Sequence, residues 1–201
     1  MSNLIMKLGD VDISKLTIDK PQKRSSYYYG LVNHNNLNNL YIQVNNLKFS
    51  SFKDNTIPYI EVIIDKEFID FLSILDKQCI QIVNENKQLW FNKDIPEDII
   101  QEMYKNIITK IKPETIKLRL PKLNDNIICK IYDNDKIRLN IDDLQPDESF
   151  TAIVNFKGIK ITKKTLSFDL CVNQIRVFRE NIPRKINTDE CILDTDDKFS
   201  D

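Results

Sequence analysis

The side chains best placed for chemistry are the lysines and arginines of the last predicted hairpin and the segment after it. They are Lys157, Lys160, Lys163, Lys164, Arg176, Arg179, Arg184 and Lys185, and Phe156, Phe168 and Phe178 lie among them. Proteins hold single-stranded nucleic acid with cations that follow the phosphates and rings that stack on bases, at about 1–3 kcal/mol per stacked base. The same pattern also fits a solvated strand face above a core that contains Phe156 and Phe168. The residues therefore favour a polyanion as ligand and leave the structural alternative open.

A run of three tyrosines offers a second group of rings. Tyr27, Tyr28 and Tyr29 follow the cations Lys20, Lys23 and Arg24 closely. In a strand, the outer two rings point to one side and Tyr28 points to the other. At least one ring is then available for stacking, although an edge strand rich in tyrosine explains the run equally well.

The end of the chain has the opposite charge. Residues 187–201 contain Asp189, Glu190, Asp194, Asp196, Asp197 and Asp201 against Lys198, a net charge of −5. The whole chain carries −1, so residues 1–186 carry +4. Such asymmetry indicates an interaction tail beside a domain that binds a polyanion or a membrane. The tail is too polar to fold alone, and its Ile192, Leu193 and Phe199 suit docking to a basic pocket of a partner or of the chain itself. A disordered end explains the same residues.

Catalytic patterns are weak in this sequence. His34 is the only histidine, zinc-type Cys and His clusters are absent, and three scattered glycines cannot form a phosphate-binding loop. Asp133-Asn134-Asp135 resembles the start of a calcium loop, but the required glycine is Arg138 and the twelfth position is Leu144. Glu61, Asp65 and Lys66 could serve a metal-dependent nuclease. We expect no enzyme activity and no cofactor, with the nuclease as the least favoured alternative.

Length and composition predict one domain of intracellular type. A chain of 201 residues buries a substantial core, and no apolar run reaches the roughly 20 residues needed to cross a bilayer. The four cysteines, Cys79, Cys129, Cys171 and Cys191, are isolated, which is typical of a reducing environment. We expect residues 1–186 to form the domain, with an N-terminal arm (1–26), and residues 187–201 to form a disordered acidic tail.

The apolar spacing predicts strands on both sides of a helical insertion. Strands are expected at 27–32, 40–44, 59–64, 116–120, 127–132 and 137–141, because apolar residues alternate there, and 47–52 continues or pairs with the second of them. Residues 65–112 carry two stripes at spacings of three and four. The first runs from Phe68 to Val83 with Asp65 as N-cap, and the second runs from Ile100 to Ile111 after Pro96.

The last hairpin contains a feature that bends sheets. Apolar parity changes after Phe156 at Gly158, and again on the return strand at Asn173-Gln174. A parity change within a strand requires an extra residue, a β-bulge, and small barrels need such bends to close. We therefore predict a mainly β (α+β) fold, an OB-like antiparallel β-barrel with a two-helix insertion at 65–112.

The order of several short motifs resembles a known family. Leu40-Tyr41-Ile42-Gln43, Trp90-Phe91, Ile116 to Pro121, Ile131-Tyr132-Asp133, Gly158-Ile159 and Gln174-Ile175-Arg176-Val177 occur in that order. In this respect the chain is similar to predicted single-stranded DNA-binding proteins of nucleocytoplasmic large DNA viruses, giant amoebal viruses included, which are thought to share the OB fold of T7-like phage single-stranded DNA-binding proteins. The chain departs from the pattern where the family often has tryptophan, at Lys160 and Leu170, and where it has a glycine-rich tip, at Lys163-Lys164.

The resemblance implies sequence-tolerant single-stranded DNA binding in viral replication, recombination or repair, in the host cytoplasm. Phosphates would follow Lys157, Lys160, Lys163, Lys164, Arg176 and Arg179, and bases would stack on Tyr28, Phe178 and, less favourably, Phe168. The lost aromatics weaken stacking and the added lysines favour phosphate contacts. The expected partners are single-stranded DNA and, through the acidic tail, replication proteins. A homodimer is left open, and no membrane partner is expected. The alternative function is that of a viral structural or assembly module that binds protein.

Overall fold

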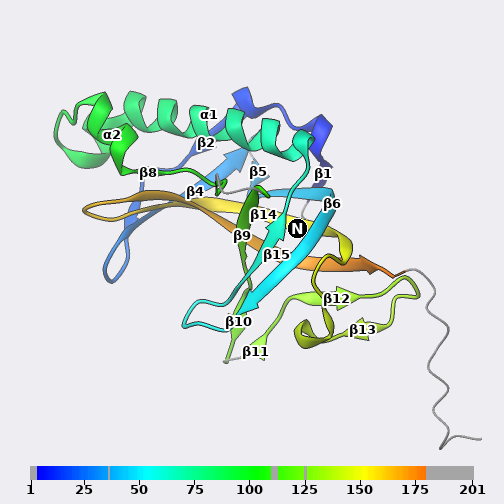
Figure 1. The fold of residues 1–201 in the computed structure, drawn as a ribbon. Helices are drawn as coiled ribbons and strands as arrows, with labels where there is room; N and C mark the ends of the chain where they lie inside the picture. Colours follow the sequence, from blue (N-terminus) through cyan, green and yellow to red (C-terminus); the bar gives the residue numbers. More distant parts are fainter. Residues whose placement is uncertain (1–3, 36, 110–112, 125, 180–201) are drawn as a thin grey trace, which may run out of the picture.

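The computed structural model describes residues 4–35, 37–109, 113–124 and 126–179, and this part of the chain is mostly β with two α-helices (Figure 1). The strands are β1 (Ile5–Lys7), β2 (Leu16–Ile18), β3 (Gln22–Lys23), β4 (Tyr28–His34), β5 (Leu37–Asn38), β6 (Leu40–Lys53), β7 (Tyr59–Ile63), β8 (Tyr104–Lys105), β9 (Thr115–Arg119), β10 (Lys122–Leu123), β11 (Asn126–Ile127), β12 (Lys130–Tyr132), β13 (Arg138–Leu139), β14 (Ser149–Ile161) and β15 (Leu166–Phe178). The helices are α1 (Lys66–Phe91) and α2 (Glu97–Met103).

The central strands close into a ring. β14 pairs antiparallel with β15 and β6, β6 pairs with β7, and β7 pairs with β9. The ring closes between β9 and β15 through a single register pair, Arg119 with Cys171. The closure therefore has the fewest paired backbone residues in the ring, and side-chain contacts have to contribute to its stability.

The β14–β15 ribbon contains both predicted bulges. The register moves from Ile153 opposite Gln174 to Val154 opposite Val172, which leaves Asn173 as the extra residue. It moves again between Phe156 and Gly158, which leaves Lys157 extra on β14. The bulge predictions are confirmed, and the ribbon serves two neighbours: the first half of β14 pairs with β6 and its last four residues pair with β4.

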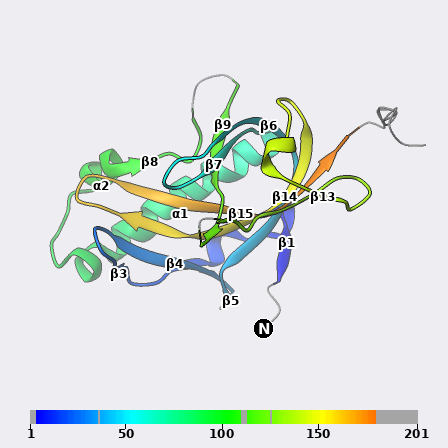
Figure 2. The same cartoon turned by 90° about the horizontal axis from the view of Figure 1, so that it is seen from below.

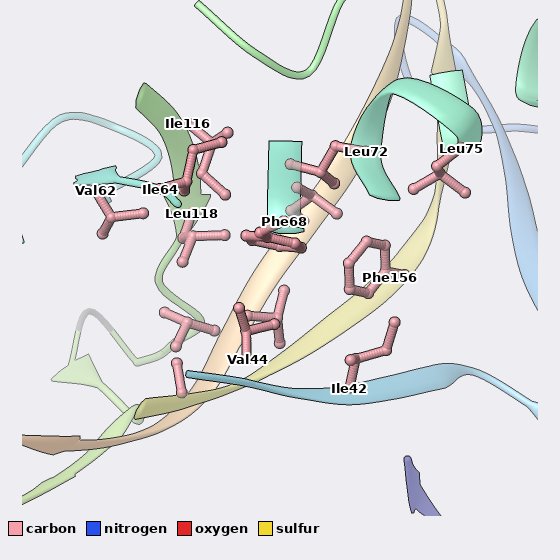
Figure 3. Packing of buried hydrophobic residues seen from close by; sticks show 14 of the residues in the cluster. Ile42, Val44, Val62, Ile64, Phe68, Leu72, Leu75, Ile116, Leu118 and Phe156 are labelled. Atoms are coloured by element: carbon pink, nitrogen blue, oxygen red, sulfur yellow. The ribbon is translucent and has the colours of Figure 1, made fainter. Parts of the chain in front are cut away.

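Helix α1 covers one opening of the ring. It begins where predicted, because the Asp65 carboxylate accepts a hydrogen bond from Phe68 N at 3.0 Å. Phe68, Leu72 and Leu75 point from α1 towards Phe156 and the side chains of β6, β7 and β9 (Figure 3). Each such buried side chain stabilises the fold by roughly 1.5–3 kcal/mol relative to exposure.

The second helix is shorter than its stripe predicts. It ends at Met103, whereas the apolar spacing extends to Ile111, which lies outside the described residues. Tyr104 instead begins β8, which runs parallel to β15. Tyr104 Oη donates to Asp76 Oδ1 at 2.7 Å, and Ile107 N donates to Asp76 Oδ2 at 3.3 Å. These contacts to α1 and β15 hold the segment extended despite its helical spacing.

The remaining segments lie along the ring. In the stretch expected as an arm, β1 pairs parallel with β6, and β2 and β3 pair with β4. The hairpin predicted across residues 133–136 is confirmed as β12–β13, which extends the sheet from the far end of β15. The acidic tail and Cys191 lie outside the described residues. No helix in the described ranges has the length and apolar character that a membrane span requires.

Candidate functional site

Three strands present one row of side chains on the outer face of the ring. Tyr29 of β4, Lys160 of β14 and Ser167 of β15 are register neighbours, so they point to the same side. They line a pocket of about 430 Å³. Its lining consists of Arg24, Tyr27, Tyr29, Leu31, Ile57, Arg119, Lys157, Lys160, Ser167, Phe168 and Asp169.

A glycine makes room for this pocket. Gly158 has no side chain, and the ring of Tyr29 lies over it: a Cβ at position 158 would stand 2.8 Å from Tyr29 Cε1 and 3.1 Å from Cζ. The neighbouring Lys157 is the bulged residue of β14. The bulge and the glycine together let a tyrosine from β4 cross β14 and reach β15.

The far end of the Tyr29 ring meets an ion pair. Tyr29 Oη donates to Asp169 Oδ2 at 2.7 Å, and Arg119 donates from Nε and Nη2 to the two carboxylate oxygens, both at 2.9 Å. Burial would raise the pKa of Asp169, but the hydrogen bonds from Arg119 and Tyr29 outweigh it and lower the pKa. Burial and the neighbouring Asp169 raise the pKa of Tyr29, which keeps its proton. This group, the Tyr29–Asp169–Arg119 clasp, joins β4, β15 and β9 beside the thin closure of the ring.

The other cations of the pocket keep their charge free. Within the described ranges, Arg24, Lys157 and Lys160 form no ion pair. Lys160 Nζ lies 4.5 Å from the centroid of the Tyr27 ring, and the Tyr27 and Tyr29 rings meet edge to face at 6.3 Å. An aromatic ring attracts an ammonium group without neutralising it. Since Asp169 is already balanced by Arg119, the pocket carries a net positive charge.

Six of the nine sequence-predicted residues lie at this end of the molecule. Lys157, Lys160 and Phe168 line the pocket, but the ring of Phe168 meets the buried Phe156 edge to face at 6.2 Å and packs against the core. Lys163 and Lys164 are exposed in the turn between β14 and β15, where the Thr162 hydroxyl accepts from Lys164 N at 3.2 Å. Tyr28 is 49% exposed and does not line the pocket, and its two neighbours line it instead.

The other three lie at the opposite end of β15. Figure 2 shows the hairpin tip beside α2 and β8 at one end and the end of β15 beyond β13 at the other. Arg176 stands 5.8 Å from the Phe178 ring centroid, and Phe178 is 49% exposed. Arg179 Nε donates to Glu148 Oε1 at 2.6 Å, which raises the pKa of Arg179. The structure does not bring Arg176, Phe178 or Arg179 to the pocket, and Arg179 is held in an ion pair.

Only three of the eleven residues that line the pocket were predicted from the sequence as site residues. The others include Arg24, Tyr27, Tyr29, Arg119 and Asp169, of which the first three were noted but not selected. The signal for the tyrosines was the alternation of the run, which places Tyr27 and Tyr29 on one side. Lys105 was also missed: it is the register neighbour of Ser167 in the parallel β8–β15 pair, so it joins the same outward row.

The alternative chemical groups have other roles. The Asp65 carboxylate caps α1, and Glu61 Oε1 lies 3.5 Å from Lys117 Nζ. The buried His34 donates from Nε2 to the Asp12 carbonyl at 2.9 Å. Among the described residues, no group of three Asp, Glu, His or Cys side chains is arranged to hold a metal ion. Burial raises the pKa of the Cys79 and Cys129 thiols to about 12, so both remain protonated.

Comparison with known proteins gives one family and several distant structures. Residues 45–192 match the family described as "Family of unknown function (DUF5871)". No curated protein matches the chain. Three solved structures are similar to it, all of the single-stranded DNA-binding protein from bacteriophage Enc34. The C-terminal truncation has 9% identity, a TM-score of 0.45 and coverage of 84% of this chain and 97% of that one. The complex with ssDNA has 10% identity, a TM-score of 0.42 and coverage of 84% of this chain and 98% of that one. A further structure has 12% identity, a TM-score of 0.45 and coverage of 90% of this chain and 98% of that one. With TM-scores below 0.5, this similarity establishes neither the fold nor the ligand of the present chain.

Proposed function

We propose that this chain, which belongs to the Family of unknown function (DUF5871), binds single-stranded DNA through the outer face of β4, β14 and β15. One observation carries the proposal. Arg24, Lys157 and Lys160, none of them in an ion pair with a described residue, gather around the rings of Tyr27 and Tyr29 in one pocket. Cations beside accessible rings are the two elements of sequence-tolerant single-strand binding.

The ring of strands supports the same proposal at the level of the fold. We assign β6, β7, β9, β15 and β14 to an OB-like barrel, with α1 packed across one opening and the ribbon bent by two bulges. Small barrels of this kind bind oligonucleotides on an open face. The fold alone does not fix the ligand, so the argument rests on the pocket.

The cations extend beyond the pocket towards the hairpin tip. Lys163 and Lys164 stand at the tip, and Lys105 lies in the row of Ser167. If about four phosphates are neutralised, the logarithm of the affinity falls with the logarithm of salt at a slope near −3, by the coefficient for single strands. Arg176 and Phe178 would serve only a longer strand that reaches the far end of β15, whereas Arg179 has a structural role beside Glu148. Tyr28 would stack only on bases outside the pocket.

The biological setting belongs to the same proposal and rests on the resemblance to viral single-stranded DNA-binding proteins. The chain would coat unpaired DNA during replication, recombination or repair of a large DNA virus, in the host cytoplasm and without enzymatic activity. The acidic tail would recruit replication proteins. Both parts depend on DNA binding, which is therefore the property to test first.

The test measures fluorescence anisotropy of a labelled oligothymidine at two salt concentrations. We expect tight binding at low salt that weakens with the slope given above. The double variant Lys157→Gln/Lys160→Gln should reduce affinity about tenfold or more, because two phosphate contacts are lost. Lys93→Gln removes an exposed lysine in the loop between α1 and α2 and serves as the matched control.

Absence of binding at low salt would reject the proposal and favour a module that binds protein. Magnesium-dependent cleavage of the oligonucleotide that Asp65→Asn abolishes would favour a nuclease.

A further inference from the structure

The pocket combines three kinds of surface in one small volume. Its walls include the rings of Tyr27 and Tyr29 and the apolar Leu31 and Ile57. Its polar groups are the Ser167 hydroxyl and the Tyr29–Asp169–Arg119 clasp, and its free cations are Arg24, Lys157 and Lys160. A volume of about 430 Å³ falls within the range of small-molecule sites, which is about 300–1,000 Å³.

We propose that this pocket holds one unstacked nucleotide, with its base against the aromatic walls and its phosphate on the free cations. The inference rests on the proposed function and assigns a ligand class to its central site. A nucleotide presents a planar ring, a hydrogen-bonding edge and a negatively charged phosphate, and each has a counterpart in the lining. Inorganic phosphate matches the cations alone, and a nucleoside matches the walls and polar groups alone.

The electrostatics permit an anion to enter despite the partly buried carboxylate of Asp169. Asp169 accepts three hydrogen bonds from Arg119 and Tyr29, so its charge is balanced before any ligand arrives. Lys160 is held 4.5 Å from the centre of an aromatic ring, which restricts its position and leaves its charge for a phosphate. The site is thus organised around a position for an anion.

The shape of the pocket selects against paired strands. A base within a duplex is stacked on both sides and must be extruded to enter a pocket, whereas a base in a single strand needs little unstacking. The pocket would therefore act as an anchor specific for unpaired nucleotides, and the lysines of the hairpin tip would add phosphate contacts that any strand can use.

The experiment is isothermal titration calorimetry of the full chain with thymidine monophosphate, thymidine and inorganic phosphate at low salt. We expect the monophosphate to bind about 5- to 150-fold tighter than inorganic phosphate, the increment of one stacked base. Tyr27→Leu should reduce affinity for the monophosphate by more than it reduces affinity for phosphate, because the ring is lost and Lys160 is kept. Lys160→Gln should reduce affinity for both. Lys163→Gln removes the same charge outside the pocket and should leave monophosphate binding unchanged.

The outcomes separate this inference from the proposed function. If oligothymidine binds but the monophosphate binds no tighter than phosphate, the nucleotide site is wrong and strand binding stands. If Lys163→Gln weakens the monophosphate as much as Lys160→Gln does, the ligand sits on general surface charge and the inference is also wrong. If neither oligothymidine nor the monophosphate binds, both proposals fail.

Discussion

At the residue scale, Asp169 is the side chain on which the site depends most. It lies between Tyr29 of β4, which pairs with β14, and Arg119 of β9, which pairs with β15. Hydrogen bonds to a charged group contribute about 1.5–3 kcal/mol each. Because the pKa of Asp169 is lowered in the folded protein, its contribution to stability is present above the unfolded pKa and is lost as pH falls through the folded pKa.

The first prediction concerns the tyrosine of this group. Tyr29→Phe keeps the ring over Gly158 and removes the hydroxyl that donates to Asp169. We expect a loss of about 1–2 kcal/mol in the free energy of unfolding at neutral pH, measured by urea denaturation. Acid unfolding should begin at a higher pH, because one group that lowers the pKa of Asp169 is gone. Tyr28→Phe, on an exposed ring, is the matched control, and an equal loss there would show that the hydroxyl of Tyr29 has no special role.

For Asp76 we predict a pH dependence of stability with the opposite sign to that of Asp169. Burial raises the pKa of Asp76, and the hydrogen bonds from Tyr104 and Ile107 only partly offset that effect. A carboxyl with a raised pKa contributes stability below its unfolded pKa and loses it as pH rises through the folded pKa. Asp76→Asn keeps an oxygen for Tyr104 Oη and removes the charge. We expect the variant to be more stable relative to the natural chain at pH 7 than at pH 4, by urea denaturation at both values; the reverse order would contradict the assignment.

At the element scale, the last hairpin shows which features of the fold can be predicted from the sequence. The two parity changes located both bulges, because period-2 alternation is a local property and a bulge interrupts it locally. The predicted length of the second helix was wrong. The apolar residues do have helical spacing, but Tyr104 and Ile107 form hydrogen bonds to the distant Asp76, which no local pattern indicates. Most of the pocket residues were missed for the same reason. Tyr29 and Asp169 are 140 positions apart, and Arg119 and Asp169 are 50 apart, and no local pattern relates them.

Gly158 tests the role of the bulged ribbon. A Cβ there would meet the Gly30 carbonyl oxygen and the ring of Tyr29, so Gly158→Ala must displace either the β4–β14 pairing or the clasp. We expect destabilisation of about 1–3 kcal/mol, as for overpacking, together with weaker oligothymidine binding. Gly9→Ala is the control, because a Cβ at Gly9 meets nothing within 4 Å. Thermal unfolding and fluorescence anisotropy on both variants measure the two effects. If Gly158→Ala changes neither stability nor affinity, the ring of Tyr29 can move aside without cost.

At the scale of the whole molecule, opposite charges occupy separate segments of one chain. Residues 1–186 carry +4 and residues 187–201 carry −5, so the tail has the same sign of charge as a DNA strand. Like charges that share a cationic surface compete, and the competition weakens with salt because both attractions are screened. Deletion of residues 188–201 should therefore tighten oligothymidine binding at low salt, and the gain should shrink as salt rises. Anisotropy on the full and shortened chains at matched salt measures it. Equal affinity of the two chains at every salt concentration would argue against self-competition and leave recruitment of a partner as the role of the tail.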